Sequence, residues 1–324
     1  MSISTEQLAG RLIPAVPVPF GSDGLVHAPA LERYAAWMAS QPIGGVAVWA
    51  HTGRGLHLRA ADADRVLGTW RRALGGAGIL IAAAGARTEC RTPAEVFHSA
   101  MAMARRAVDL GADALLVHPP AAFRAQADRD HLILDYHARL AEAGRPLVLF
   151  YLYEAAGGIA YPSELLSALL ERPEVLGVKV ATLDSVMTFQ DIARRITAAA
   201  PGKLLITGED RFLGYSLMCG ARAALIGMAA ACTGLQAQLL HSYWQGDGQR
   251  FLALNAAVDD LAQHTFLAPM EGYIRRMLWC LVHQGVIPDD AAHDPWGPPL
   301  DPAEFDRLGA CLARVGILPR SSND

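Results

Sequence analysis

The segment Val175-Leu176-Gly177-Val178-Lys179-Val180 is a short apolar run that carries a single charge. A run of this length and composition is typical of a β-strand that is buried on both faces. Seven similar runs occur along the chain, and each is followed by a longer stretch in which apolar residues recur with helical period. This alternation predicts βα units and a parallel sheet.

The spacing of these runs leaves room for one crossover helix after each strand, because successive strands begin about 20 to 35 residues apart. The predicted strands are Leu12–Val18, Gly44–Trp49, Ile79–Ala84, Ala112–Val117, Leu147–Tyr151, Leu176–Val180, Leu204–Thr207 and Ala223–Ile226. The predicted helices are Pro29–Ala39, Ala60–Ala73, Pro93–Leu110, Asp130–Ala143, Pro162–Leu170, Val186–Ala199 and Phe212–Met218.

Eight such units favour a closed (β/α)8 TIM barrel over an open doubly wound sheet. An open dinucleotide-binding sheet would carry a glycine-rich loop after its first strand, but Pro17-Val18-Pro19-Phe20 stands there. We expect the barrel to occupy residues 1–230. We expect residues 231–324 to form a C-terminal helical segment that packs on the barrel within a single structural unit.

The composition excludes several classes of protein. The chain of 324 residues has a formal net charge of −4, which is not the footprint of a nucleic-acid-binding protein. Its five cysteines are widely spaced and never form a CxxC pair, so neither a disulfide framework nor a zinc site is indicated. The N-terminus does not resemble a signal peptide, and no apolar run is long enough to span a membrane. We therefore expect a soluble cytoplasmic protein.

Lysine is scarce in this chain, because 26 of the 28 basic residues are arginine and only Lys179 and Lys203 are lysine. Lys179 lies at the end of the sixth predicted strand, where barrel enzymes carry their active groups. Its apolar neighbours lower the pKa of the amine, and a neutral amine can form a Schiff base with a carbonyl group. The alternative is a strand-end lysine that extends to the surface. Lys203, in a loop at the opposite rim, is expected to be a solvated charge.

Two tyrosines at the end of the fifth predicted strand are further candidates. Tyr151 and Tyr153 share a face of that strand, so one or both phenols can face the barrel mouth and transfer protons. The alternative is that these aromatic rings only pack the strand.

Polar residues also follow the second and seventh predicted strands. The second runs into His51-Thr52-Gly53-Arg54, which offers a hydroxyl, backbone N–H groups and a cation to a carboxylate. His51 is either a proton carrier or a satisfied polar residue. The seventh ends in Gly208-Glu209-Asp210, and Asp210 is well placed to cap the helix that follows.

Together these segments resemble the dihydrodipicolinate synthase and N-acetylneuraminate lyase family of Schiff-base aldolases over roughly residues 8–318. Residues 45–54 stand where the family has a strand followed by G-T-T-G-E. Leu149-Phe150-Tyr151 stands where it has the tyrosine of its Y-N-x-P segment. Residues 175–179 fit its strand ending in G-x-K, residues 208–210 fit its G-x-D, and residues 220–227, which include Leu225, fit its last barrel strand.

The resemblance implies a (β/α)8 barrel with three C-terminal helices. It also implies a homo-oligomer, a tetramer or a dimer, that acts on pyruvate or another 2-oxo acid without metal or organic cofactor. Carried over by position, Lys179 forms the imine and Tyr151 shuttles protons. By the same resemblance, Thr52 with the Gly53 amide holds the carboxylate of the 2-oxo acid, and Gly208, Asp210 and Leu225 lie at the substrate. Arg54 or Arg211 is expected to supply a second carboxylate contact, because arginine offers bidentate geometry.

The chain departs from the family pattern at several of these positions. His51 replaces the first threonine of the loop and Arg54 replaces its glutamate, while Ala156 stands where the synthase has a substrate-binding arginine. Pro120-Ala121-Ala122 replaces a pair of tyrosines. We therefore expect an aldolase or hydro-lyase other than the lysine-pathway synthase, with a sugar-acid dehydratase as an alternative. His51 can act as a base near neutral pH in place of the missing hydroxyl.

Two further alternatives do not involve a Schiff-base enzyme. A metal-dependent class II aldolase could use His51, His118, Glu209 and Asp210, which all fall near predicted strand ends but have no recognised ligand spacing. The second alternative is a non-catalytic barrel that binds a 2-oxo acid.

Overall fold

The computed structural model describes residues 3–183 and 185–317, and over this part of the chain eight parallel strands form a barrel. Neighbouring strands follow the order β1-β8-β7-β6-β5-β4-β3-β2. A parallel bridge between Ala15 and Ala47, with the N–H of Val16 donating to the carbonyl of Ala47 (3.0 Å), joins the two ends of this order. The predicted (β/α)8 barrel is confirmed.

All eight predicted strands are present, although their ends differ by a few residues. The first is the most shortened, because Pro17 and Pro19 have no N–H to donate to a strand ladder. The strands are β1 Leu12–Pro14, β2 Gly45–Val48, β3 Ile79–Ala83, β4 Ala114–Val117, β5 Leu147–Leu152, β6 Val175–Ala181, β7 Leu204–Thr207 and β8 Ala223–Ile226.

A helix follows every strand, so that α2 to α9 complete the eight βα units and α10 to α12 lie beyond them. This agrees with the three extra helices that the resemblance implies. The expected boundary at residue 230 therefore falls between β8 and its own helix, α9. The helices are α1 Thr5–Leu8, α2 Ala28–Ala39, α3 Ala60–Leu74, α4 Pro93–Asp109, α5 Arg129–Ala141, α6 Ser163–Leu170, α7 Val186–Ala199, α8 Leu213–Met218, α9 Thr233–Trp244, α10 Gly248–Thr265, α11 Tyr273–His283 and α12 Ala303–Arg314.

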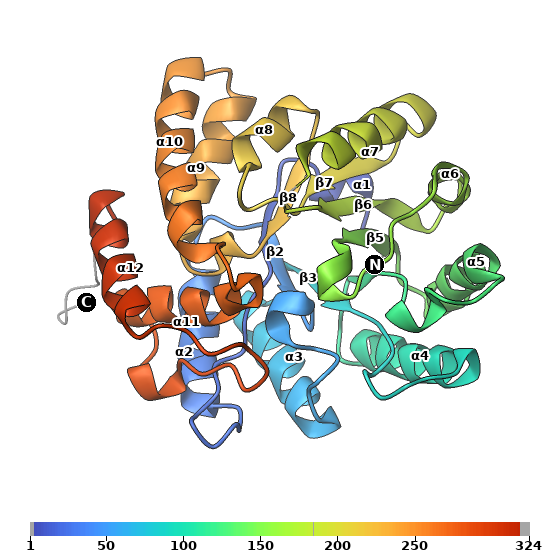
Figure 1. Ribbon diagram of the computed structural model, residues 1–324, viewed down its shortest axis with the longest axis horizontal. Helices are drawn as coiled ribbons and strands as arrows, with labels where there is room; N and C mark the ends of the chain where they lie inside the picture. The colour runs from blue at the N-terminus through green and yellow to red at the C-terminus, as the bar shows by residue number, and fades with distance from the viewer. Residues whose placement is uncertain (1–2, 184, 318–324) are drawn as a thin grey trace.

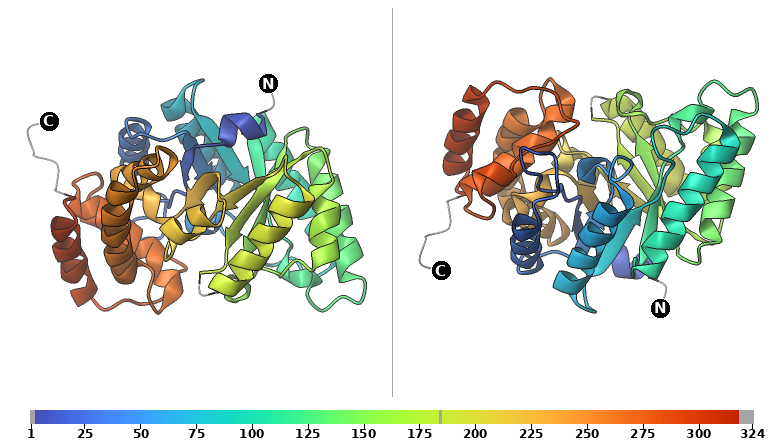
Figure 2. Two further views of the ribbon diagram at one scale, coloured as in Figure 1. Left: turned by 90° about the horizontal axis from the view of Figure 1, so that it is seen from above. Right: turned by 90° about the horizontal axis from the view of Figure 1, so that it is seen from below.

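The helices surround the strands, and the C-terminal helices gather on one side of the barrel. Figure 1 shows α10, α11 and α12 together in orange to red, and both views in Figure 2 show the same grouping. These three helices pack on one another, and α10 also packs on α9. None of the helices in the described residues is long and apolar enough to cross a membrane.

The register of the sheet determines which side chains enter the barrel. Lys179 on β6 lies opposite Phe150 on β5 and Ile206 on β7, and residues in register on parallel strands point to the same face. Gly208, two residues after Ile206, makes room for this lysine, since a Cβ there would lie 2.7 Å from Lys179 Cε. The side chain of Lys179 therefore lies inside the barrel, near the carboxyl ends of the strands.

Candidate active site

Lys179 is a buried amine, with only 5% of its surface exposed. Burial lowers the pKa of its ammonium group from 10.5 to about 8, against the opposing influence of the nearby Asp210 and Glu209 carboxylates. Its Nζ atom lies 4.0 Å from the centre of the Phe150 ring. The predicted position of this lysine at the carboxyl end of the sixth strand is confirmed, and its environment favours the nucleophilic neutral form.

Lys203 has a different environment. Its Nζ atom donates hydrogen bonds to the carbonyls of Arg172 (2.8 Å) and Val175 (2.6 Å), which ties the loop before β7 to the start of β6. The expected solvated charge is therefore a structural contact. Since the chain has two lysines, Lys179 supplies the lysine amine at the carboxyl end of the barrel.

Phe150, and not Tyr151, lies beside this amine. The ladder between β5 and β6 starts with Leu147 opposite Val175, but the register then shifts by one residue and Val148 lies opposite Gly177. The shift brings Val180 opposite Tyr151, whose ring packs against Tyr161 at 6.0 Å between centres. A one-residue shift moves a side chain to the other face, so the structure does not support the proton shuttle expected at Tyr151.

The two acids that follow β7 are held by backbone N–H groups. The Glu209 carboxylate accepts hydrogen bonds from the N–H of Thr182 (2.6 Å) and of Leu183 (2.9 Å). The Asp210 carboxylate accepts one from the N–H of Met228 (2.7 Å), which joins the ends of β7 and β8. Burial raises the pKa of each acid to about 7.

The capping role expected for Asp210 is wrong. Helix α8 begins at Leu213, and Phe212 occupies the N-cap position without a side-chain hydrogen bond. The Asp210 side chain turns instead toward β8, where the hydrogen bond to the N–H of Met228 satisfies a donor in the barrel interior. Leu225, in the middle of β8, is a buried interior residue.

Two of the substrate contacts expected after β2 are also occupied by the protein itself. The N–H of Gly53 donates to the carbonyl of Ala50 (2.9 Å) within the short 3-10 helix His51–Gly53. The buried Arg54 guanidinium donates to Asp294 (2.7 Å) and to Glu271 (3.0 Å). Neither group is free for a substrate carboxylate in this arrangement, which corrects the sequence-based expectation.

Glu271 is the centre of a hydrogen-bonded cluster at the barrel mouth, and it comes from the 3-10 helix Met270–Gly272 just before α11. Its carboxylate accepts hydrogen bonds from His51 Nε2 (2.8 Å), Arg54 Nη1 (3.0 Å) and the hydroxyl of Tyr153 (2.8 Å). Burial alone would raise the pKa of Glu271, but these donors lower it to about 2. The group is therefore a carboxylate at neutral pH.

This carboxylate fixes the role of His51. Because a carboxylate only accepts hydrogen bonds, the proton of the imidazole must lie on Nε2. In the neutral ring Nδ1 then keeps its lone pair and can act as a base. His51 also lines the cavity at the barrel mouth, so this base faces the space that a substrate would enter.

Thr52 is paired with a second residue of the C-terminal segment. Its hydroxyl lies 2.9 Å from the hydroxyl of Tyr273, at the start of α11. Two hydroxyl groups joined by one hydrogen bond have one further O–H between them to donate. The pair can therefore offer a donor to a carboxylate.

Sequence reasoning missed Glu271, Tyr273 and Asp294, which all lie in the C-terminal segment. The search for site residues followed strand ends, and these residues belong to no strand. The only signal for Glu271 is its place in a break, between Pro269 and Gly272, that separates two helical stretches.

A cavity of about 340 Å³ opens at the carboxyl ends of β2 to β5, and its lining comes from the segments that follow these strands. His51, His118 and Phe150 all line it. Burial lowers the pKa of His118 to about 4, so that its ring is neutral at physiological pH. Phe150 lines this cavity, and its ring also contacts the Lys179 amine, so the cavity and the amine share this residue as a neighbour.

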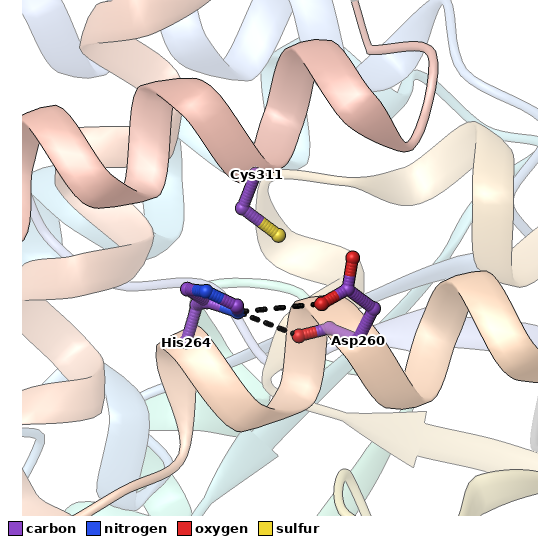
Figure 3. Close-up of side chains that lie close together, drawn as sticks. All are labelled: Asp260, His264 and Cys311. Atoms are coloured by element: carbon purple, nitrogen blue, oxygen red, sulfur yellow. Dashed lines mark hydrogen bonds and ion pairs between the residues drawn. The ribbon is translucent and has the colours of Figure 1, made fainter.

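The four candidates for a class II metal site do not converge on one point. Among the described residues, the one group of three potential ligands within reach of one another is Asp260, His264 and Cys311, on α10 and α12 outside the barrel (Figure 3). Arg314 already donates to both oxygens of Asp260 (2.8 and 2.9 Å). Burial raises the pKa of Cys311 to about 11, which keeps the thiol protonated. The cluster is best described as an ion pair between two helices.

With this geometry in place, the comparison with known families is decisive. The Dihydrodipicolinate synthetase family matches residues 8–307, nearly the whole chain. The chain belongs to this family. The resemblance inferred from the sequence is confirmed.

Curated relatives of this dihydrodipicolinate synthetase family member share about a quarter of its residues. A probable mitochondrial 4-hydroxy-2-oxoglutarate aldolase of Emericella nidulans is 25% identical over 259 residues, 78% of this chain and 81% of the relative. A 4-hydroxy-tetrahydrodipicolinate synthase of Parasynechococcus marenigrum is 27% identical over 260 residues, 79% of this chain and 80% of the relative.

Solved structures of the family share its fold. A sialic acid aldolase of Ruminococcus gnavus superposes with a TM-score of 0.80 at 19% identity, covering 95% of this chain and 98% of the other. A prophage protein of the family from E. coli K12, in complex with pyruvate, gives a TM-score of 0.81 at 18% identity with the same coverage.

Proposed function

We propose that this family member is a class I lyase that acts on pyruvate or another 2-oxo acid through a Schiff base on Lys179. The observation that carries the proposal is the buried amine at the carboxyl end of β6, whose pKa is lowered to about 8. Nζ attacks the C2 carbonyl carbon of the 2-oxo acid and water leaves, which gives an imine that withdraws electrons from C3.

The Thr52 and Tyr273 pair is the proposed site of the substrate carboxylate. Both hydroxyls are buried at the barrel mouth, and one O–H of the pair remains to donate. A charge-assisted hydrogen bond from a buried hydroxyl orients the 2-oxo acid as well as binding it. This replaces the pairing of Thr52 with the Gly53 amide that the sequence suggested.

His51, held by Glu271, is the proposed proton carrier. Loss of a proton from C3 of the imine gives an enamine, whose C3 forms a bond to the carbon of an aldehyde while the aldehyde oxygen takes up a proton. Hydrolysis then releases a 4-hydroxy-2-oxo acid and restores the amine, and the reverse sequence is aldol cleavage. With a 2-oxo acid that carries a hydroxyl group on C4, the enamine can instead expel this group, which takes up a proton and leaves as water, so the scheme covers a hydro-lyase.

We further propose that the protein is not the lysine-pathway synthase, whose relatives it resembles in sequence. Phe150 lies where a tyrosine would meet the amine, and Pro120-Ala121-Ala122 leaves no phenol after β4. Assay with pyruvate and aspartate semialdehyde tests this directly. Turnover of that pair at a rate matching any other aldehyde would contradict the proposal.

Borohydride trapping tests the Schiff base. Incubation with pyruvate and borohydride should add one reduced pyruvate to the intact protein, on the peptide that contains Lys179. The Lys179→Arg variant should give no adduct, whereas Lys203→Arg, the matched change at the other lysine, should label as the wild type does. Absence of an adduct with a panel of 2-oxo acids would rule the proposal out, and an adduct without turnover of any aldehyde would identify a binding barrel.

Two more measurements separate the remaining alternatives. His51→Ala should lower kcat more than it raises KM, and an unchanged kcat would remove His51 from the mechanism. Exhaustive chelation should leave activity intact, and loss of activity restored by a divalent cation would favour the class II aldolase.

A further inference from the structure

The cavity beside Lys179 is suited to one chemical class of aldehyde. We propose that it receives a flat, apolar group, such as an aromatic ring, on the aldehyde that adds to or leaves the 2-oxo acid. This inference rests on the proposed Schiff-base function and names the substrate class of that site. Its volume, about 340 Å³, is within the range of cavities that enclose small organic ligands.

The walls of the cavity are apolar over most of their extent. The Phe150 and Tyr136 rings line it, and both are buried. The lining also includes aliphatic side chains, among them Leu56, Ala84, Ala86, Val96, Ala122 and Leu152. Within the part of the chain that the structure describes, no aspartate or glutamate lines the cavity. Transfer of an apolar group of the substrate from water to contact with such walls is therefore favourable.

The cations around the cavity are engaged by protein groups. The Arg54 guanidinium is bonded to Asp294 and Glu271, and Arg87 donates to the carbonyl of Leu58 (2.9 Å) and to Glu89 (3.0 Å). Arg91 is exposed at the outer rim. An aldehyde that carries a carboxylate therefore finds no unengaged cation in the depth of the cavity.

A polyhydroxylated aldehyde fits the walls equally badly. Each hydroxyl group that leaves water needs a new hydrogen-bond partner, and an unmet partner costs free energy. The aliphatic wall offers none. The polar side chains of the lining include His51, His57, Thr88 and His118, and of these His51 already donates its Nε2 proton to Glu271.

One polar group in the wall has no partner. Tyr136 lines the cavity, its side chain is fully buried, and its hydroxyl has no hydrogen-bond partner among the described residues. Its ring is held in place by Phe97 and Phe123. This hydroxyl has almost no accessible surface, so Tyr136 presents its aromatic ring to the cavity rather than its polar atom.

The test compares three aldehydes with pyruvate on the wild-type protein: benzaldehyde, glyceraldehyde and glyoxylate. We expect kcat/KM for benzaldehyde to exceed that for the other two by at least about tenfold, as burial of an aromatic ring in an apolar site warrants. Equal or better use of glyceraldehyde or glyoxylate would overturn the inference. Pyruvate labelling by borohydride is measured in parallel, and its absence would instead reject the Schiff base itself.

Variants of the wall sharpen the test. Ala122→Glu, in the 3-10 helix Ala121–Phe123 after β4, should lower kcat/KM for benzaldehyde about tenfold while leaving pyruvate labelling intact, because a carboxylate in the cavity wall opposes an apolar ring. If this variant does not fold, Leu56→Ser provides the same comparison. Unchanged aldehyde preference in folded variants of Ala122 and Leu56 would show that the cavity does not bind the aldehyde.

Discussion

The two sides of the barrel mouth are built in different ways. On the β6 and β7 side, Lys179 lies on β6 and Asp210 follows the end of the neighbouring strand β7, near enough for the two charges to interact. On the β2 side, His51 and Arg54 are held by Glu271 and Asp294, more than two hundred residues further along the chain. The first side therefore follows from local periodicity, and the second depends on where the C-terminal segment packs.

The largest effect is expected on the strand-built side. Lys179→Arg keeps the positive charge but has no amine that can form an imine, so turnover should fall at least about 10³-fold. Pyruvate release or consumption measures the effect, and circular dichroism checks that the fold is retained. Lys203→Arg should retain most activity. Substantial turnover by Lys179→Arg would mean that the nucleophile lies elsewhere. The β6 and β7 side would then not be the side that carries the covalent chemistry.

The side built by the C-terminal segment should show a smaller but distinct effect. Glu271→Gln keeps the size of the side chain but removes the charge that holds the Nε2 proton of His51, so kcat should fall about 10- to 100-fold. KM for the 2-oxo acid should change much less, because Glu271 acts through His51.

A matched control for this variant lies at the opposite rim. Glu174→Gln changes an ion-paired glutamate beside Arg172 just before β6 and should leave kcat unaltered. If Glu271→Gln raised KM and left kcat in place, Glu271 would be a purely structural residue.

The β6 and β7 side of the site could be predicted from the sequence, whereas the side held by the C-terminal segment could not. The barrel and the position of Lys179 could be inferred because eight apolar runs alternate with helical periods, and the scarcity of lysine narrowed the search. Glu271 and Tyr273 could not, because their contacts with His51 and Thr52 join segments that share no periodic pattern. The sequence favoured Arg54 as a substrate ligand because it does not reveal the contacts of Arg54 with Asp294 and Glu271, which lie far along the chain.

Tyr151 shows a different limit, within the strand-built side itself. Its expected role rested on the two-residue period of the fifth strand and on the resemblance to the family, and an unbroken ladder from Leu147 and Val175 would bring Tyr151 opposite Lys179. A single irregularity between Leu147 and Val148 changes the pairing and brings Phe150 there instead. Sequence period alone cannot locate such a bulge, because it alters the count without altering the alternation of residue types.

Gly208 offers a way to perturb the strand-built side without touching a polar group. In Gly208→Ala the new Cβ would lie 2.7 Å from Lys179 Cε and 2.9 Å from the Val180 carbonyl, so the lysine must move. We expect imine formation to slow by about tenfold, as for a modest misplacement of a reacting group. Rapid quenching with borohydride measures the rate. Gly202→Ala, at an exposed glycine whose added Cβ has nothing within 4 Å, is the control, and equal rates in the two variants would show that the close packing at Gly208 is irrelevant.

The smallest expected effect is a shift in pH dependence. Only the neutral amine attacks a carbonyl, and burial lowers the pKa of Lys179 to about 8, so the rate of imine formation should rise with pH and level off above about 8. Near that pH Asp210 is ionised, because its own pKa is about 7, and its charge stabilises the ammonium form. Asp210→Asn removes the charge but keeps an oxygen for the Met228 N–H.

The midpoint of the profile should therefore move to lower pH in this variant, by on the order of one unit. The shift would make the variant faster than the wild type below pH 8 if geometry is unchanged, which is the opposite of the result for a damaged site. A midpoint that stays in place or moves upward would mean that the amine does not sense Asp210. In that case burial alone would set the pKa of Lys179. The register between β6 and β7 would then position the lysine without affecting its protonation.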